Sequence, residues 1–142
     1  MSSPLATYGN IPEILQIEQE ILKMPQVDLP LLHYLIPGVY VRRLSIPAGT
    51  ILTGKIHNFE SIAILAEGTL RIADNEHAHR ISAPHVLVDK PGIKRLGFAE
   101  TDVTFLTVHS IKNQSIADIE NELVSNSFEE FETQLQLLGE LP

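Results

Sequence analysis

A succession of short apolar runs between residues 38 and 110 constrains this chain most. The runs are Val39–Ile46, Thr50–Ile56, Ile62–Glu67, Thr69–Ala73, Arg80–Ala83, His85–Val88, Lys94–Phe98 and Val103–His109. Turn-forming residues separate them, such as Gly49, Gly68 and Gly92, and no helical pattern interrupts the series. Eight short strands joined by tight turns, without crossover helices, predict a mainly β fold in which antiparallel strands form one sandwich or barrel.

The two ends of the chain have helical spacing instead. Asn10 can cap a first helix, Pro12 is tolerated in its first turn, and Pro25 ends it. The stretch from Val27 to Pro37 contains two prolines, Pro30 and Pro37, and is expected to be an extended connector. We therefore divide the one domain into 1–37, helix and connector, 38–112, barrel, and 113–142, a helical tail.

The tail carries two capping-box-like starts and an apolar stripe. The starts begin at Ser115 and Ser127. The stripe consists of Phe128, Phe131, Leu135 and Leu138. It can pack on the chain's own barrel, which we favour, or on a second subunit. We expect a homo-oligomer, most simply a dimer.

Composition limits the class of protein. A chain of 142 residues suits one hydrophobic core, and the absence of cysteine excludes disulfides and thiol chemistry. The first residues lack the pattern of a signal peptide, and no apolar stretch reaches the roughly 20 residues that a membrane span needs. We expect a cytoplasmic protein that does not enter a membrane.

The charges are unevenly distributed along the chain. The net charge is -8, which argues against general binding to nucleic-acid backbones. Nine of the ten Lys and Arg residues nevertheless lie between Arg42 and Lys112. This segment predicts a local anion site, although acidic ends that merely aid solubility explain the same distribution.

The stretch from Gly49 to Gly68 resembles the first conserved motif of cupins, G-x5-H-x-H-x3-E-x6-G. The spacing fits throughout, with Lys55 at the first histidine position, His57 at the second and Ser61 at the glutamate position. The stretch from Ala83 to Arg95 looks like the second motif, with Pro91 and Gly92 but without its histidine. The resemblance covers about residues 38–110 and implies a double-stranded β-helix, or jelly roll.

The chain also resembles small cupin-like proteins of tailed phages and bacteria that have no settled activity. The matching stretches include His33 with 37–40, 46–50, 54–57, 80–84, 91–97 and 107–109. In that family a histidine commonly stands where this chain has Ser61.

The cupin resemblance places Lys55 and His57 on the inner face of the barrel, together with Ser61. His109, on the last strand, approaches His57 if its face of that strand points inward. The metal-ligand candidates are His57, His109 and Glu60, and the ions considered are Fe, Mn, Zn and Ni. On a regular strand, side chains three residues apart point to opposite faces, so Glu60 would not share the face of His57.

Basic residues stand where a cupin would present metal ligands. Such groups favour a carboxylate, phosphate or nucleotide. The predicted ligand-binding set is Lys55, His57, Ser61, Lys94, Arg95, Arg43 and His109, with Arg42 as the alternative to Arg43. Buried cations need acidic partners, and Asp89 is one candidate.

Three functions remain open at this point. The first is a non-catalytic module that binds a small anion, with a nucleotide as one case. In a phage, such a module would sequester a host signalling molecule. The second is a metal-dependent cupin enzyme, an isomerase or a dioxygenase. The third is an oligomeric structural or accessory phage protein. We favour the first, without catalysis.

Overall fold

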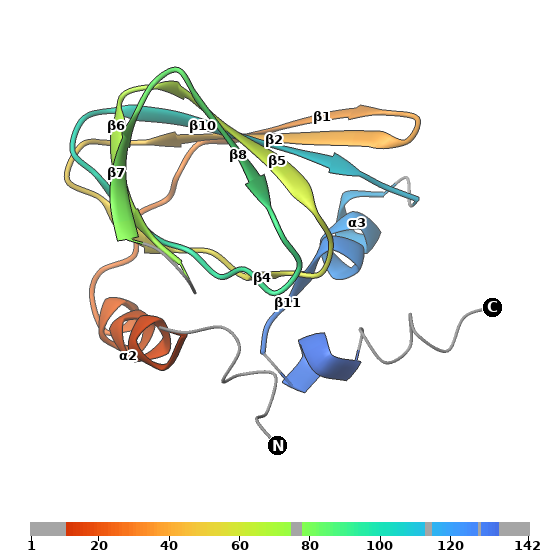
Figure 1. Cartoon of the computed structure of the whole chain (residues 1–142), viewed down its shortest axis with the longest axis horizontal. Helices are drawn as coiled ribbons and strands as arrows, with labels where there is room; N and C mark the ends of the chain where they lie inside the picture. Colours follow the sequence, from red (N-terminus) through yellow and green to blue (C-terminus); the bar gives the residue numbers. More distant parts are fainter. Residues whose placement is uncertain (1–10, 75–77, 113–114, 128, 134–142) are drawn as a thin grey trace.

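The structure is a computed structural model that describes residues 11–74, 78–112, 115–127 and 129–133. Two antiparallel sheets form a barrel, and helices α2 (Ile11–Leu22) and α3 (Ile116–Leu123) lie on its lower side in Figure 1. The strands are β1 (Leu31–Ile36), β2 (Val39–Ile46), β3 (Ile51–Thr53), β4 (Ile56–His57), β5 (Ser61–Glu67), β6 (Thr69–Ala73), β7 (Ala78–Ser82), β8 (His85–Asp89), β9 (Leu96–Ala99), β10 (Val103–Ser110) and β11 (Val124–Ser125). The predicted mainly β jelly roll with helices at both ends is confirmed.

The larger sheet has five strands in the order β1-β2-β10-β5-β8. Burial alternates along its strands because successive side chains point to opposite faces. In β5, for example, Ser61, Ala63 and Leu65 are buried, whereas Ile62 is exposed. The smaller sheet has the order β3-β9-β6-β7, and β4 pairs with β11.

The main hydrophobic core fills one end of the space between the two sheets. It consists of Ile46, Leu65, Leu70, Ile72, Ile81, Ala99 and Val103. Both sheets contribute, so this core holds them together and leaves the polar inward residues of β2, β5, β8 and β10 at the other end.

The structure explains why the last position of the first cupin-like motif, Gly68, is a glycine. Its backbone has φ +89°, and an added Cβ would lie 2.2 Å from the carbonyl oxygen of Asp102. Only glycine fits both the conformation and the space. The β5–β6 turn can therefore pass close to the β9–β10 loop.

The predicted connector contains a strand. Residues 31–36 pair with β2 as β1, in a register that runs from Leu31↔Leu44 to Ile36↔Val39. Its two prolines, Pro30 and Pro37, flank this strand without interrupting it. The sheet thus begins earlier than the first apolar run of the series, at an edge, where prolines are tolerated.

The predicted run Thr50–Ile56 divides into β3 and β4 around Gly54 and Lys55. The other seven runs correspond to β2 and β5–β10, with ends that differ by at most two residues. Gly54 donates its backbone N–H to the carbonyl of Arg95 across this break.

The two helices pack on different strands, α2 on β3 and α3 on β11. Ser115 caps α3 by accepting a hydrogen bond from the N–H of Asp118 at 3.3 Å, as the capping pattern predicts. Ile119 and Leu123 of α3 pack against Tyr40 and Ile111. Within the described ranges, no helix is long and apolar enough to cross a membrane.

The apolar stripe of the tail is described only in part. Phe131 is fully buried within the chain, which supports packing on the chain itself at that position. The side chains of Phe128, Leu135 and Leu138, and the Asn10 cap, lie outside the described residues.

Candidate functional site

A cavity of about 130 Å³ lies inside the barrel, next to the main core. Its polar lining consists of Arg42, Lys55, His57, Arg95 and Thr107. The rest is mainly apolar and comes from both sheets, with Leu31, Leu44, Ile46, Leu52, Leu70 and Phe105. The cavity therefore has charged groups on an otherwise apolar wall, which is the usual composition of a small-molecule site.

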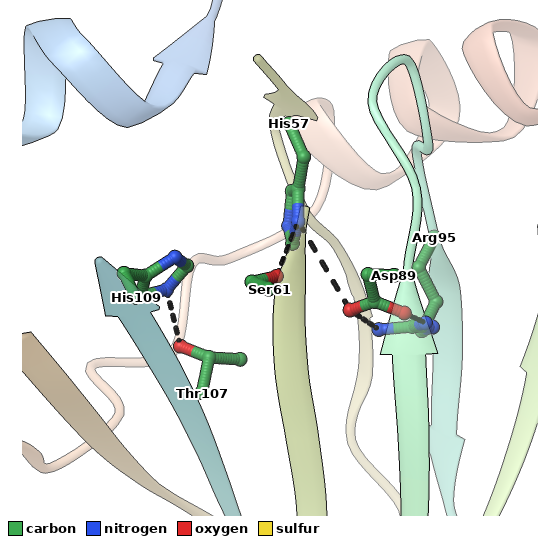
Figure 2. A network of polar contacts seen from close by, with 6 residues as sticks. All are labelled: His57, Ser61, Asp89, Arg95, Thr107 and His109. Carbon is green, nitrogen blue, oxygen red and sulfur yellow. Dashed lines mark hydrogen bonds and ion pairs between the residues drawn. The ribbon is translucent and has the colours of Figure 1, made fainter. Parts of the chain in front are cut away.

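Arg95 is held in place by Asp89 (Figure 2). Its Nη1 donates to Asp89 Oδ2 at 3.2 Å, and its Nη2 donates to Oδ1 of the same carboxylate. The Asp89 side chain is 1% exposed and that of Arg95 is 13% exposed. The guanidinium also lies over the Phe105 ring, 5.8 Å from its centroid. These contacts fix the plane of the guanidinium but leave its Nε buried without a hydrogen-bond partner.

Arg42 enters the cavity from β2. Alternation along this strand turns Tyr40, Arg42, Leu44 and Ile46 inward and Arg43 outward. Arg42 Nε is also buried without a partner, and Arg42 and Arg95 are the two residues with such side-chain atoms in the described ranges. An unsatisfied buried donor costs about 1–3 kcal/mol, and both of these donors belong to residues that line the same cavity.

His57 connects the cavity to Asp89. Its Nδ1 lies 3.3 Å from Ser61 Oγ and 4.0 Å from Asp89 Oδ2 (Figure 2). Burial lowers the pKa of His57 to about 4. Asp89 opposes this shift, whereas the charges of Arg95 and Arg42 reinforce it. His57 is therefore neutral at pH 7 and can offer its ring nitrogens as hydrogen-bonding groups.

His109 stands beside His57, with 6.2 Å between the ring centroids. Its Nε2 lies 2.9 Å from Thr107 Oγ1. Burial, His57 and Arg42 lower its pKa to about 4, against the effect of Asp89. The ring of Tyr40 stacks at 6.0 Å from that of His109, and Tyr40 Oη lies 2.5 Å from His33 Nδ1.

Five of the predicted ligand-binding residues lie together. Lys55, His57 and Arg95 line the same cavity, Ser61 is hydrogen-bonded to His57, and His109 is next to His57. All five are on or beside the inner faces that the cupin resemblance implied.

The other two predicted residues lie elsewhere. Lys94 is buried outside the cavity lining, where its Nζ donates to Glu18 at 2.9 Å and to the carbonyl of Gly54 at 2.8 Å. Arg43 is exposed on the outer face of β2. The inward position that we assigned to Arg43 is occupied by Arg42, because the alternation of β2 is set by its buried Tyr40 and Ile46.

Thr107 is the polar lining residue that sequence reasoning missed as a member of the site. Its signal was available, since it has the parity of His109 on β10, two residues away. Arg42 and Asp89 were considered as an alternative cation and as an acidic partner, and the structure brings both to the site.

The donor set does not fit a resident metal ion. Among the described residues, no group of three His, Asp or Glu side chains is placed to hold one. His57 and His109 converge, but Glu60 is exposed, and Lys55 and Ser61 stand where the motif would supply further ligands. Arg42 and Arg95 add positive charge that opposes a cation.

Comparison with known proteins supports the fold. No family model and no curated protein matches the sequence. Solved structures do match, among them a cupin superfamily protein from Desulfitobacterium hafniense, at a TM-score of 0.52 and 10% identity over 63% of this chain and 83% of that one. The cupin domain of Schizosaccharomyces pombe Cnp3 matches at 0.50 and 14% identity, over 62% and 71% of the two chains.

A salicylate 1,2-dioxygenase from Pseudoaminobacter salicylatoxidans also matches, at a TM-score of 0.52 and 15% identity, over 67% of this chain but only 29% of the enzyme. At these identities the likeness shows the fold alone. This chain has the cupin fold, a double-stranded β-helix, and nothing in the comparisons connects it with a phage.

Proposed function

We propose that this protein binds a small anion in the barrel cavity, without catalysing a reaction. The observation that carries the proposal is the convergence of two guanidinium groups, those of Arg42 and Arg95, on one largely apolar cavity. A carboxylate, phosphate or sulfonate oxygen supplies the acceptor that a guanidinium N–H prefers. Lys55 adds a third cation to the lining, whereas Asp89 already neutralises part of the charge of Arg95.

The apolar lining selects an organic acid over a simple inorganic ion. Leu44, Ile46, Leu70 and Phe105 would contact the body of a ligand whose charged head lies at the two arginines. Burying apolar surface of the ligand contributes about 25 cal/mol per Å², which adds to the electrostatic attraction.

The size of the cavity limits the buried part of the ligand. A cavity of about 150 Å³ accepts a benzene molecule, and this one has about 130 Å³. A short aliphatic or aromatic acid fits such a volume. A nucleotide would place one group inside and most of its atoms outside.

Binding without catalysis also accords with the geometry at His57. Both Ser61 Oγ and Asp89 Oδ2 lie near the same ring nitrogen, Nδ1. A serine–histidine–aspartate relay needs the serine and the carboxylate at opposite ring nitrogens. Ser61 is therefore not placed as a nucleophile that His57 and Asp89 could activate.

Native mass spectrometry of the untreated, untagged protein is the most direct test, because it reports a retained ligand or metal and the subunit number together. Isothermal titration with benzoate, hexanoate, phosphate and AMP then compares the ligand classes. We expect the short organic acids to bind most tightly. A bound metal ion at one per chain, or binding of none of these anions, contradicts the proposal.

Two neighbouring arginines provide a matched pair of variants. Arg42→Gln removes an inward guanidinium, and we expect the affinity for the acid to fall about tenfold or more. Arg43→Gln removes a guanidinium from the next residue on the opposite face, and the affinity should stay within about twofold. Equal losses in both variants would show a general charge effect instead of a cavity site.

A further inference from the structure

The outer face of the five-stranded sheet carries two continuous rows of side chains. The register places one residue of each row on every strand, in the order β1-β2-β10-β5-β8. The first row is Tyr34, Val41, Val108, Ile62 and Val88, and the second is Leu32, Arg43, Leu106, Ile64 and Val86. Nine of these ten side chains are aliphatic or aromatic, so this face is the reverse of the polar outer face that a solvated sheet normally shows.

Several of these side chains are widely open to solvent. The exposed fractions are 67% for Val88, 61% for Val86 and 53% for Leu32. Of the described helices, α2 contacts β3, whereas α3 contacts β11 and the inward-facing Tyr40 of β2. A contiguous apolar surface of this kind marks an interface.

The size of the face suits a second copy of the chain. Five strands about 4.8 Å apart and about seven residues long, at about 3.3 Å each, give the whole outer face of the sheet, which extends beyond the two rows, a plan of roughly 24 by 23 Å. The accessible surface of side chains standing on such a plan exceeds its flat area. The accessible surface of this face therefore approaches the area that each partner buries in a standard interface, which is about 800 Å².

The charges on the face are complementary to themselves. Arg43 lies on β2 in the second row. Glu67 lies on β5, one row beyond the second row, next to Thr104 of β10. A two-fold axis along β10, the middle strand, places β5 of one copy over β2 of the other. Glu67 of each copy then lies beside Arg43 of the other copy, which gives two symmetric ion pairs at the border of the apolar rows.

We propose that two copies of this chain pack face to face through these two rows, related by a two-fold axis along β10. The proposal does not depend on the ligand, because the cavity lies on the inner side of the same sheet.

The first test measures the oligomeric state of the full chain by sedimentation velocity over a wide range of concentration. We expect a dimer for the natural sequence and a dissociation constant about a hundredfold or more higher for Val86→Lys, because two lysines would be buried in the interface. Val88→Lys, at an even more exposed position, is the second variant, and circular dichroism checks that both fold. Leu22→Lys is the matched control, because Leu22 on α2 and Val86 on β8 are both 61% exposed. This variant should dimerise normally.

The second test reverses the charges. Arg43→Glu and Glu67→Arg should each weaken the dimer, and the double variant should recover most of the loss. A natural chain that is monomeric at all concentrations, or a dimer that survives Val86→Lys and Val88→Lys, overturns the proposal. Two weakened single variants without recovery in the double variant overturn the two-fold arrangement.

Discussion

The carboxylate of Asp89 holds the guanidinium of Arg95 with two hydrogen bonds, at a side-chain exposure of 1% and 13%. The same carboxylate lies 4.0 Å from His57. Asp89 is therefore the group that orients one cavity cation and compensates its charge, and its two hydrogen bonds use one of the two hydrogens on each Nη of Arg95.

Asp89→Asn should destabilise the fold strongly. It leaves a buried guanidinium without its counter-charge, and breaking one partner of a buried pair costs about 3–5 kcal/mol. Urea unfolding followed by circular dichroism measures the loss. The control is Glu20→Gln, which breaks the exposed pair with Lys23 and should cost less than about 1 kcal/mol. Similar losses of unfolding free energy in both variants would show that the buried pair stabilises the fold no more than the exposed pair does.

The stability of the fold should fall as the pH falls from about 7 to about 4. His57 and His109 have pKa values of about 4 in the folded state, whereas a histidine of the unfolded chain has one of about 6.5. Between these values the unfolded state binds protons that the folded state does not, so the free energy of unfolding falls by about 1–3 kcal/mol per histidine. The contribution is fully present above pH 6.5.

Guanidinium unfolding at several pH values tests this dependence. The double variant His57→Gln/His109→Gln should lose most of the slope between pH 6.5 and pH 4 while keeping the part that carboxylates contribute. An unchanged slope in the double variant would contradict neutral, buried histidines.

Anion binding should become tighter at lower pH. An anion in the cavity lies close to His57 and raises the pKa of its ring, so binding takes up a proton. Benzenesulfonate stays ionised throughout the range, and its affinity should rise by up to about tenfold per unit as the pH falls from 7 to 5. Calorimetric titrations in two buffers of different ionisation enthalpy measure the proton uptake. His57→Gln should bind with an affinity that no longer depends on pH, and a dependence that persists would place the proton elsewhere.

Lys94 and Glu18 should anchor helix α2 to the barrel. Thr53 Oγ1 donates to Glu18 Oε2 at 2.5 Å, and Lys94 Nζ donates to the same oxygen at 2.9 Å. Burial raises the pKa of Glu18, but these two hydrogen bonds outweigh it and lower the pKa overall. Glu18→Gln should cost about 1–3 kcal/mol because Lys94 keeps its charge in a buried position.

Amide hydrogen exchange locates the effect of that substitution. Exchange in α2 should accelerate more than exchange in β5 or β10. Gln19→Glu, at the neighbouring exposed position of α2, is the reverse substitution and should leave exchange nearly unaltered. Uniform acceleration throughout the chain would show a global loss instead of a local anchor.

Local patterns were sufficient for most of the fold. Period-two alternation and turn residues predicted the strand runs, and glycine at position 68 was recognisable because only glycine tolerates its backbone. The edge strand β1 was not recognised, because its flanking prolines are typical of a connector and its pairing with β2 is a contact that no single segment encodes.

The site was determined only in part by the sequence. Alternation required that Arg42 and Arg43 point to opposite faces, but not which of them faces the core, and the packing of Tyr40 and Ile46 decides for Arg42. Likewise, the sequence made Lys94 a candidate cation of the anion site, yet its partner Glu18 is 76 residues away. Spacing along one strand fixes relative orientation, whereas the neighbours of a side chain depend on which distant strands and helices pack together, and only the tertiary structure decides that.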